Sequence, residues 1–355
     1  MAQRNDPARR SMPFDEWPEL DRHGWERATT RGDVFDDSGR GASWADRTKT
    51  TNIQHYSRWL GYLAFIEELM AEVSPSDRVT RDAVSRYNKH LIGLGTVAPR
   101  TRLSMLVGLK ETIRAMTPER NWRWLQDMCN HVQRNAVPSR EKQQRVRSSI
   151  EIYEAALKGL AALPADFTKL AHLIDYRDHL MLALLAARPL RKKNFASLRL
   201  DRHVVRRDAK WLITIKGDET KTGQAIEFWV PDGLVIWFER YLTEIRPLFP
   251  GAESSIQLWL TKDGPAIGSQ FLYYRITKLT KRLFGAPINP HLLRDCAATT
   301  LAMESADLVQ TAPALLGHRH ASTTARYYVQ ARNLDASRKI NSIMDAVKTQ
   351  LETAE

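Results

Sequence analysis

Apolar residues recur at three- and four-residue steps over residues 53–70, and this spacing predicts an amphipathic helix that ends before Ser74. Thr80 is a typical N-cap residue for a second helix, which Gly93 would end. The same apolar spacing follows over about residues 80–92, 101–116 and 122–132. We therefore predict a compact, all-helical domain over residues 45–133.

The pattern is interrupted over residues 134–149, which hold five basic residues, one acidic residue and only two large aliphatic residues. Such a stretch cannot bury an apolar face, so it is predicted to be a basic linker. Helical spacing resumes at Ile150 and continues into the apolar run Met181–Ala187. A second domain is expected over residues 150–330, followed by a C-terminal helix within residues 331–355.

Short strands are predicted inside this second domain. Residues 211–216 and 225–230 are rich in Ile, Thr, Phe, Trp and Val, and residues 203–205 are a candidate third strand. The remaining apolar spacing is helical, over about residues 236–242, 271–283, 294–303, 306–316, 323–329 and 340–351. The predicted fold class is mainly α with a small antiparallel β-sheet.

The 355 residues are enough for about two domains, and the net charge of +12 gives a pI near 9.7. The charge is uneven, because residues 1–44 carry seven Arg against nine acidic residues, a net charge of −2 that leaves +14 for the rest. Residues 1–44 show no sustained apolar period and are predicted to be an N-terminal appendage of unknown role. The basic remainder suits a polyanionic partner, and nucleic acid is the first candidate.

The longest unbroken apolar run, Leu180–Ala187, has eight residues. A bilayer span needs about 20, and the N-terminus lacks the apolar core of a signal peptide, so we expect a cytoplasmic protein with no membrane partner. Cys129 and Cys296 lack zinc-type spacing and are expected to be packing thiols in a reducing compartment.

Four segments of the second domain combine cationic, imidazole and phenolic side chains: Arg188–Leu198, Thr220–Gly223, His291–Arg294 and Leu315–Tyr327. In this order and spacing they resemble the signature of the tyrosine recombinase, or phage integrase, family. The resemblance implies a helical core-binding domain followed by a tyrosine-recombinase catalytic domain. It also implies catalytic roles for Arg191, Lys221, His291, Arg294, His318 and Tyr327.

The chemistry of phosphodiester cleavage explains why these residue types belong together. Attack by a side-chain oxygen places negative charge on the nonbridging phosphate oxygens, and fixed cationic donors stabilise that charge. The guanidinium groups of Arg191 and Arg294 would each donate paired hydrogen bonds, and His318 would add a third donor. We therefore expect neither a metal nor a cofactor.

A tyrosine has a pKa of about 10, so its hydroxyl needs a proton acceptor at pH 7, and the departing 5′ oxygen needs a donor. The resemblance assigns these roles to His291 and Lys221. Tyr327 would hold DNA as a 3′-phosphotyrosine. This linkage conserves the energy of the broken bond, so a 5′ hydroxyl from another strand can reverse the cleavage step without ATP. Tyr328 would point about 100° away on a helix, and the nine-residue spacing from His318 selects Tyr327.

Three residues depart from the family pattern: Pro189 stands where glycine is common, Asn194 where a carboxylate is common and Asp295 where a second histidine is frequent. Pro189 and Asn194 leave open a catalytically weak, DNA-binding accessory recombinase, whereas position 295 is variable in the family. A type IB topoisomerase-like relaxing enzyme would share the chemistry. His318 and His320 also have a metal-binding spacing, but no acidic or cysteine partner lies near them in sequence.

The family resemblance implies a site-specific recombinase that acts in DNA integration or excision, or in transposition. Its partners would be double-stranded DNA, three further copies in a homotetramer on two DNA sites, and an accessory recombinase or DNA-bending protein. It would act in the cytoplasm at the nucleoid of a prokaryotic or mobile-element host. The C-terminal helix would pack either on its own domain or on an adjacent protomer.

Overall fold

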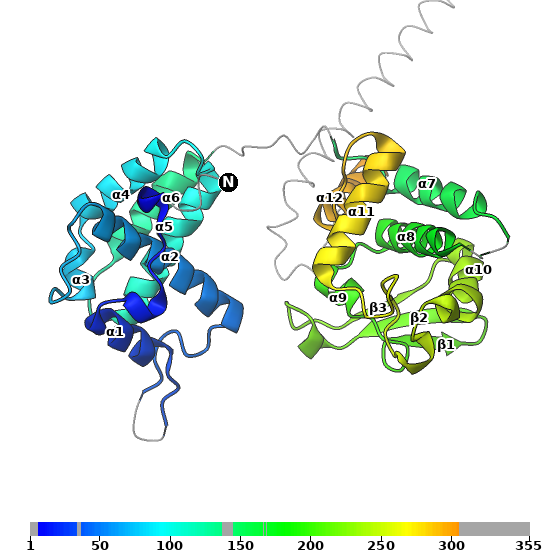
Figure 1. Ribbon diagram of the computed structural model, residues 1–355, viewed down its shortest axis with the longest axis horizontal. Helices are drawn as coiled ribbons and strands as arrows, with labels where there is room; N and C mark the ends of the chain where they lie inside the picture. The colour runs from blue at the N-terminus through cyan, green and yellow to red at the C-terminus, as the bar shows by residue number, and fades with distance from the viewer. Residues whose placement is uncertain (1–5, 34–36, 137–144, 166, 168, 305–355) are drawn as a thin grey trace, which may run out of the picture. The chain divides into compact units, whose positions relative to one another are not determined.

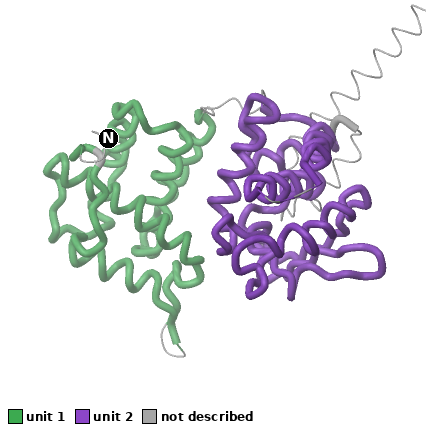
Figure 2. The backbone as a smooth tube through the Cα atoms, turned by 45° about the vertical axis from the view of Figure 1, so that its right-hand side comes forward, with its two compact units in different colours: residues 1–141 green, residues 142–355 purple. Residues whose placement is uncertain are grey.

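The computed structural model describes residues 6–33, 37–136, 145–165, 167 and 169–304, and the chain divides into two compact units, residues 1–141 and 142–355 (Figure 2). Each unit has its own apolar core. The described part is mainly helical and contains a small antiparallel sheet of three strands, which confirms the predicted fold class.

The first unit is helical throughout its regular elements. Thr80 caps α4, because its Oγ1 accepts a hydrogen bond from Ala83 N at 3.2 Å, as the sequence predicted. Helix α2 ends earlier than predicted, since the chain turns at Glu67 with a φ of 58°; Ile66 and Leu69 still pack against the core. The elements are η1 (Pro7–Arg9), η2 (Phe14–Glu16), α1 (Glu19–Thr29), α2 (Asp46–Phe65), α3 (Pro75–Arg78), α4 (Arg81–Gly93), α5 (Pro99–Met116) and α6 (Arg123–Arg134) (Figure 1).

The described part of residues 1–44 differs from the predicted appendage, because it is built into the first core. Trp17 is 2% exposed, and its indole nitrogen donates to Ser57 Oγ on α2 at 3.0 Å. Asp21 on α1 is fully buried, where it pairs with Arg78 and accepts a hydrogen bond from Tyr56 Oη at 2.6 Å. A buried carboxylate needs such partners, so they tie the segment to α2 and α3.

The second unit is organised around α8, which is buried continuously from Tyr176 to Ala186. Residues 180–186 are apolar on every face, and the buried polar residues before them, Arg177–His179, have polar partners. Neither α8 nor any other described helix is long and apolar enough to cross a membrane. The helical elements are α7 (Ser149–Ala161), α8 (Leu170–Ala187), α9 (Lys192–Ala196), α10 (Asp232–Arg240), the π-helical turn η5 (Tyr241–Ile245), η6 (Arg246–Leu248), η7 (Ala252–Ser254), α11 (Ser269–Phe284) and α12 (Pro290–Glu304).

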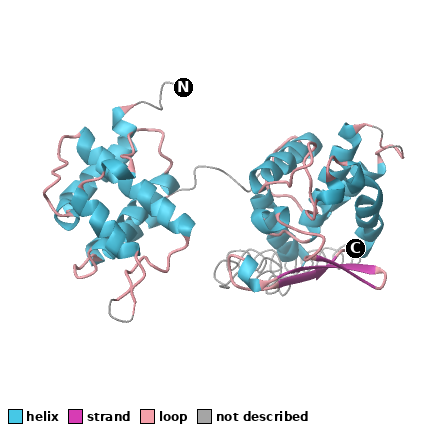
Figure 3. Ribbon diagram, turned by 60° about the horizontal axis from the view of Figure 1, so that its bottom comes forward, coloured by secondary structure: helices cyan, strands magenta, loops and turns pink. Residues whose placement is uncertain are grey.

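The three-stranded sheet lies along one side of the helices of the second unit (Figure 3). Its strands are β1 (Val204–Arg207), β2 (Lys210–Ile215) and β3 (Ile226–Trp229), in the order β1-β2-β3, and both pairs are antiparallel. Ile213 at the centre of β2 faces Val204 on one side and Phe228 on the other. The strands occur where the sequence predicted them, and the short 3-10 turn η4 (Gly217–Glu219) connects β2 to β3.

A buried ion cluster joins α8 to α11. Asp178 is 2% exposed and pairs with Arg177 at 2.7 Å and with Arg275 of α11 at 2.6 Å. Arg177 also donates from Nη1 to the carbonyl oxygen of Leu260 at 2.6 Å. One carboxylate thus pairs with two cations, and the cluster fixes α8, which leads into the Arg191 link, against α11.

Candidate active site

The first site residue, Arg191, lies in the short link between α8 and α9. It occupies the N-cap position of α9 with an extended backbone, and its carbonyl oxygen accepts a hydrogen bond from Phe195 N at 3.0 Å. Leu190 beside it is buried in the core, which anchors the link. Arg191 is half-buried, and burial lowers the pKa of its guanidinium below the usual value, although an arginine stays charged at neutral pH.

The segment His291–Arg294 forms the first turn of α12, which begins earlier than predicted. Asn289 caps this helix, because its Oδ1 accepts hydrogen bonds from the backbone N of His291 and of Leu292, both at 3.0 Å. Pro290 follows as the first helical residue, a position that suits proline. His291 is exposed, and Arg294 lies one turn later on the same face of the helix and is 7% exposed.

Arg294 joins the two arginine segments directly. Its Nη1 donates a hydrogen bond to the carbonyl oxygen of Pro189 at 2.6 Å, two residues before Arg191. The N-terminus of α12 and the link between α8 and α9 therefore meet. The positive end of the α12 dipole and the two guanidinium-bearing segments make this place attractive to an anion such as a phosphate.

The predicted lysine lies in the connection between β2 and β3. Lys221 is exposed in a turn closed by a hydrogen bond from Gly223 N to Thr220 O at 3.4 Å. Gly223 adopts a φ of 72°, which strains any residue with a Cβ. A Cβ on Gly217 would lie 2.5 Å from Gly223 O, so both glycines permit the tight path of this connection.

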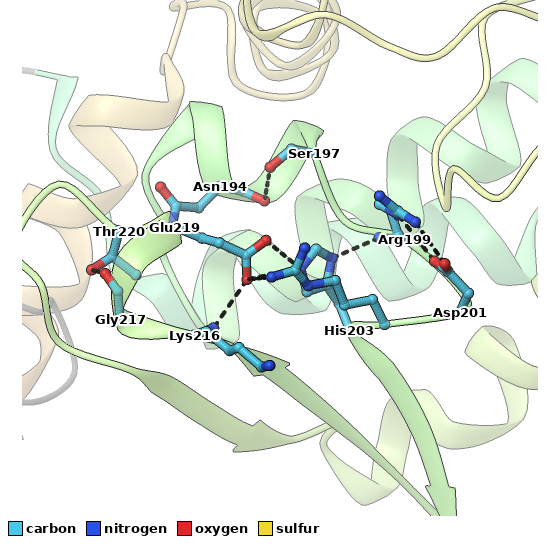
Figure 4. A network of polar contacts seen from close by, with 10 residues as sticks. Asn194, Ser197, Arg199, Asp201, His203, Lys216, Gly217, Glu219 and Thr220 are labelled. Atoms are coloured by element: carbon cyan, nitrogen blue, oxygen red, sulfur yellow. Dashed lines mark hydrogen bonds and ion pairs between the residues drawn. The ribbon is translucent and has the colours of Figure 1, made fainter.

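A polar network that sequence reasoning missed supports this turn (Figure 4). His203 is 4% exposed, and its Nε2 lies 3.1 Å from Oε1 of Glu219, two residues before Lys221. The carboxylate also accepts a hydrogen bond from Lys216 N at 3.2 Å. No periodic pattern links positions 203 and 219; the only sequence signal is a histidine inside an otherwise apolar candidate strand.

Two predicted site residues, His318 and Tyr327, lie outside the described residues, as do the helices expected over residues 306–351. The structure therefore brings the segments of Arg191 and Arg294 together and places His291 beside the latter. The roles of all six residues stay predictions. Asn194, noted as a departure from the family pattern, is buried on α9, and its carbonyl oxygen accepts a hydrogen bond from Ser197 Oγ at 3.2 Å.

No group of three His, Cys, Asp or Glu side chains that could hold a metal ion occurs in the part of the chain that the structure describes. Where the two segments meet, the described residues supply two guanidinium groups and an imidazole. Such groups can donate hydrogen bonds to an anion such as a phosphate.

Comparison with known proteins finds a family match within the second unit and relatives of the chain. Residues 162–333 match the phage integrase family. Tyrosine recombinase XerD of Pseudomonas putida is 33% identical over 178 residues, which cover 49% of this chain and 55% of that protein. Tyrosine recombinase XerC of Pseudomonas syringae pv. syringae is 27% identical over 207 residues, 56% of this chain and 62% of that protein. The chain thus spans little more than half the length of these relatives.

Solved structures show the same fold. The XerH site-specific recombinase bound to a palindromic difH substrate, in a post-cleavage complex, aligns with a TM-score of 0.54 at 14% identity, over 94% of this chain and 99% of that one. The pre-cleavage complex of XerH with difH gives a TM-score of 0.52 at 17% identity, over 80% of this chain and 76% of that one.

The described residues thus share the fold of the XerH recombinase structures. Residues 162–333, just under half of the chain, match the phage integrase family, so this part of the chain belongs to that family.

Proposed function

We propose that the chain is a site-specific DNA recombinase that cleaves and rejoins DNA strands through a 3′-phosphotyrosyl intermediate. The observation that carries this proposal is the hydrogen bond from Arg294 to Pro189 O, because it joins the segments of both predicted arginines at the capped N-terminus of α12. A scissile phosphate there would meet two guanidinium groups and a helix dipole of the right sign.

The proposed reaction begins with Tyr327. Its hydroxyl oxygen attacks the phosphorus, its proton passes to His291, and the bond from phosphorus to the 5′ oxygen breaks. Lys221 gives a proton to that 5′ oxygen, so the products are a 3′-phosphotyrosine and a 5′ hydroxyl. Arg191 and Arg294 stabilise the charge on the nonbridging oxygens, together with His318. Attack by the 5′ hydroxyl of another strand reverses these steps and exchanges the strands.

A pocket of about 420 Å³ in the first unit supports DNA binding by that unit as well. Its lining includes Arg40, Arg114, Arg120 and Arg123 beside Trp122. Arg120 pairs with Asp77 at 2.5 Å, whereas no ion pair or hydrogen bond involves the guanidinium groups of Arg40 or Arg123 among the described residues. We propose that the pocket accepts a backbone phosphate of the duplex, because clustered guanidinium groups gain most from such a partner.

The proposed partners are double-stranded DNA and three further copies of the chain on two DNA sites, in the cytoplasm of a prokaryotic or mobile-element host. An accessory recombinase or a DNA-bending protein would assist. The relatives are named recombinases, so we favour recombination over a catalytically weak accessory role and over topoisomerase-like relaxation. A relaxing enzyme would act on supercoiled plasmids of any sequence.

The test is capture of covalent adducts on sheared genomic DNA from the organism that encodes the chain. Denatured protein is precipitated with its attached DNA, and the attached 3′ ends are sequenced. The wild type should recover one or a few sites, which then serve as the cognate duplex. Tyr327→Phe should bind DNA but recover none, whereas Tyr328→Phe should recover the same sites. Covalent adducts formed by Tyr327→Phe would show that another residue is the nucleophile. A wild type that forms no adduct would contradict the proposed function.

A further inference from the structure

Lys221 is exposed, and its side chain has no hydrogen bond or ion pair with any residue that the structure describes. Among the described residues, its ammonium group is directed by the backbone of the turn that carries it. A general acid displaced by about 1 Å can lose about 10²-fold in rate, so whatever fixes this turn matters for the reaction. The contacts that fix the turn are made by Glu219 and Thr220, the two residues before the lysine.

Thr220 closes the turn from within. It is 9% exposed, and its Oγ1 lies 3.0 Å from Gly217 O and 2.9 Å from Gln224 O, so one hydroxyl spans both ends of the connection. These contacts fix the shape of the turn. They do not fix its position on the rest of the unit, because all of them lie between residues 217 and 224.

Glu219 makes the contact that leaves the turn. Figure 4 shows its side chain pointing away from the turn toward His203, on the segment that runs from α9 to β1. Burial alone would raise the pKa of this carboxyl. Hydrogen bonds from His203 and from Lys216 N, together with the charge of Arg202 at 3.5 Å, outweigh burial and hold the pKa below its usual value. Glu219 is therefore ionised at neutral pH and accepts hydrogen bonds with both oxygens.

His203 is itself rigidly held. Its Nδ1 accepts a hydrogen bond from Arg199 N at 2.9 Å, so the ring hydrogen is on Nε2, where it faces Glu219. Its backbone N donates to Arg199 O at 2.9 Å, and its carbonyl oxygen accepts from Thr214 N of β2 at 2.9 Å. The imidazole thus has one hydrogen-bond donor, Nε2, and one acceptor, Nδ1, and each has a partner.

We propose that His203 and Glu219 are positioning residues that hold the Lys221 turn in register with the segment that follows Arg191. The chain of contacts runs from Arg199 through the imidazole to the carboxylate, and then over two residues of backbone to the lysine. This inference rests on the proposed function, because it assigns the pair a role through Lys221.

The first test compares cleavage rates on the cognate duplex with rates on a duplex whose bridging 5′ oxygen is replaced by sulfur. A thiolate leaves without protonation, so the sulfur substrate removes the need for a general acid. Glu219→Ala should cleave ordinary DNA about 10- to 10²-fold more slowly and should recover to within about threefold of wild type on the sulfur substrate. Glu219→Gln, which keeps an oxygen acceptor for Nε2, should lose much less.

The matched control is Asp201→Ala, which removes an exposed carboxylate from the same network without touching the turn, since Asp201 pairs with Arg199 at 2.6 Å. It should cleave both substrates at the wild-type rate. Equal slowing of Glu219→Ala on both substrates would mean general damage and would overturn the positioning role. An unchanged rate on ordinary DNA would overturn it too.

A second measurement needs no DNA and separates this inference from the proposed function. Backbone hydrogen exchange of the full chain, followed by mass spectrometry, should show faster exchange over residues 217–224 in Glu219→Ala and in His203→Phe than in the wild type. Asp201→Ala should match the wild type. Unchanged exchange in the first two variants would overturn the inference even if the chain recombines DNA. Faster exchange in these two variants, combined with a wild type that forms no adduct on DNA, would instead place the failure on the proposed function.

Discussion

The guanidinium of Arg294 donates a hydrogen bond to the carbonyl oxygen of Pro189 at 2.6 Å, although the two residues are 105 positions apart in the chain. The contact holds the start of α12 against the link that carries Arg191. The acceptor is a backbone oxygen, so a proline supplies it as well as a glycine would. The departure from the family pattern at position 189 is thus compatible with this junction.

Arg294→Lys tests the junction. Lysine keeps the charge but lacks the planar fork, so it cannot hold the Pro189 carbonyl and a phosphate oxygen in the same geometry. Cleavage of the cognate duplex should fall by about 10²- to 10³-fold, with little change in DNA binding. The control is Arg282→Lys, an exposed residue of α11 that pairs with Asp175 at 3.2 Å. A wild-type cleavage rate in Arg294→Lys would contradict its predicted role.

Salt dependence tests the arginine pocket of the first unit. The logarithm of the binding constant should fall linearly with the logarithm of salt concentration, with a slope of about −0.9 for each phosphate neutralised. Arg123→Ala should weaken binding and reduce the slope by about 0.9. Arg10→Ala, which removes an exposed cation that pairs with Glu16, should leave the slope unchanged. An equal slope in wild type and Arg123→Ala would exclude a phosphate at this position.

Asp178→Ala should destabilise the second unit strongly. It would leave Arg177, which is 1% exposed, without its carboxylate, and removal of one partner from a buried ion pair costs about 3–5 kcal/mol. Urea unfolding of the full chain, followed by hydrogen exchange of α8 peptides, measures this unit alone. Asp263→Ala, which breaks an exposed pair with Lys262, should leave the transition in place. A transition unchanged in Asp178→Ala would show that the cluster contributes nothing.

The thiols of Cys129 and Cys296 should be unreactive in the folded chain, which can be tested in the absence of DNA. Burial raises the pKa of Cys129 and of Cys296 to about 11. At pH 8 only about one thiol in 10³ would then be ionised, and both side chains are buried. A chromogenic disulfide reagent should therefore react with neither cysteine in the folded chain and with both after denaturation in guanidinium chloride. Rapid labelling of the native chain would contradict this.

The sequence predicts most elements because their signals are local. Apolar spacing locates α4, α5 and α6, Thr80 marks a cap, and the apolar run of α8 marks a central helix. The missed features are contacts between distant positions. Asp21 meets Arg78 only because α1 and α3 pack together, and the approach of β2 to the segment after α9 brings His203 to Glu219. Tertiary packing alone selects these partners, so neither spacing nor propensity could reveal them.

Lys221 is the proposed general acid. If it protonates the departing 5′ oxygen, Lys221→Ala should cleave ordinary DNA about 10²- to 10⁴-fold more slowly, with binding nearly unchanged because one cation among many contributes little to affinity. The sulfur-substituted duplex should restore its rate, since a thiolate needs no proton. Arg191→Ala and Arg294→Ala should not recover to the same degree, because their lost donors act on the nonbridging oxygens. Equal rescue of all three variants, or none for Lys221→Ala, would show that Lys221 is not the general acid, and His291 would be the next candidate.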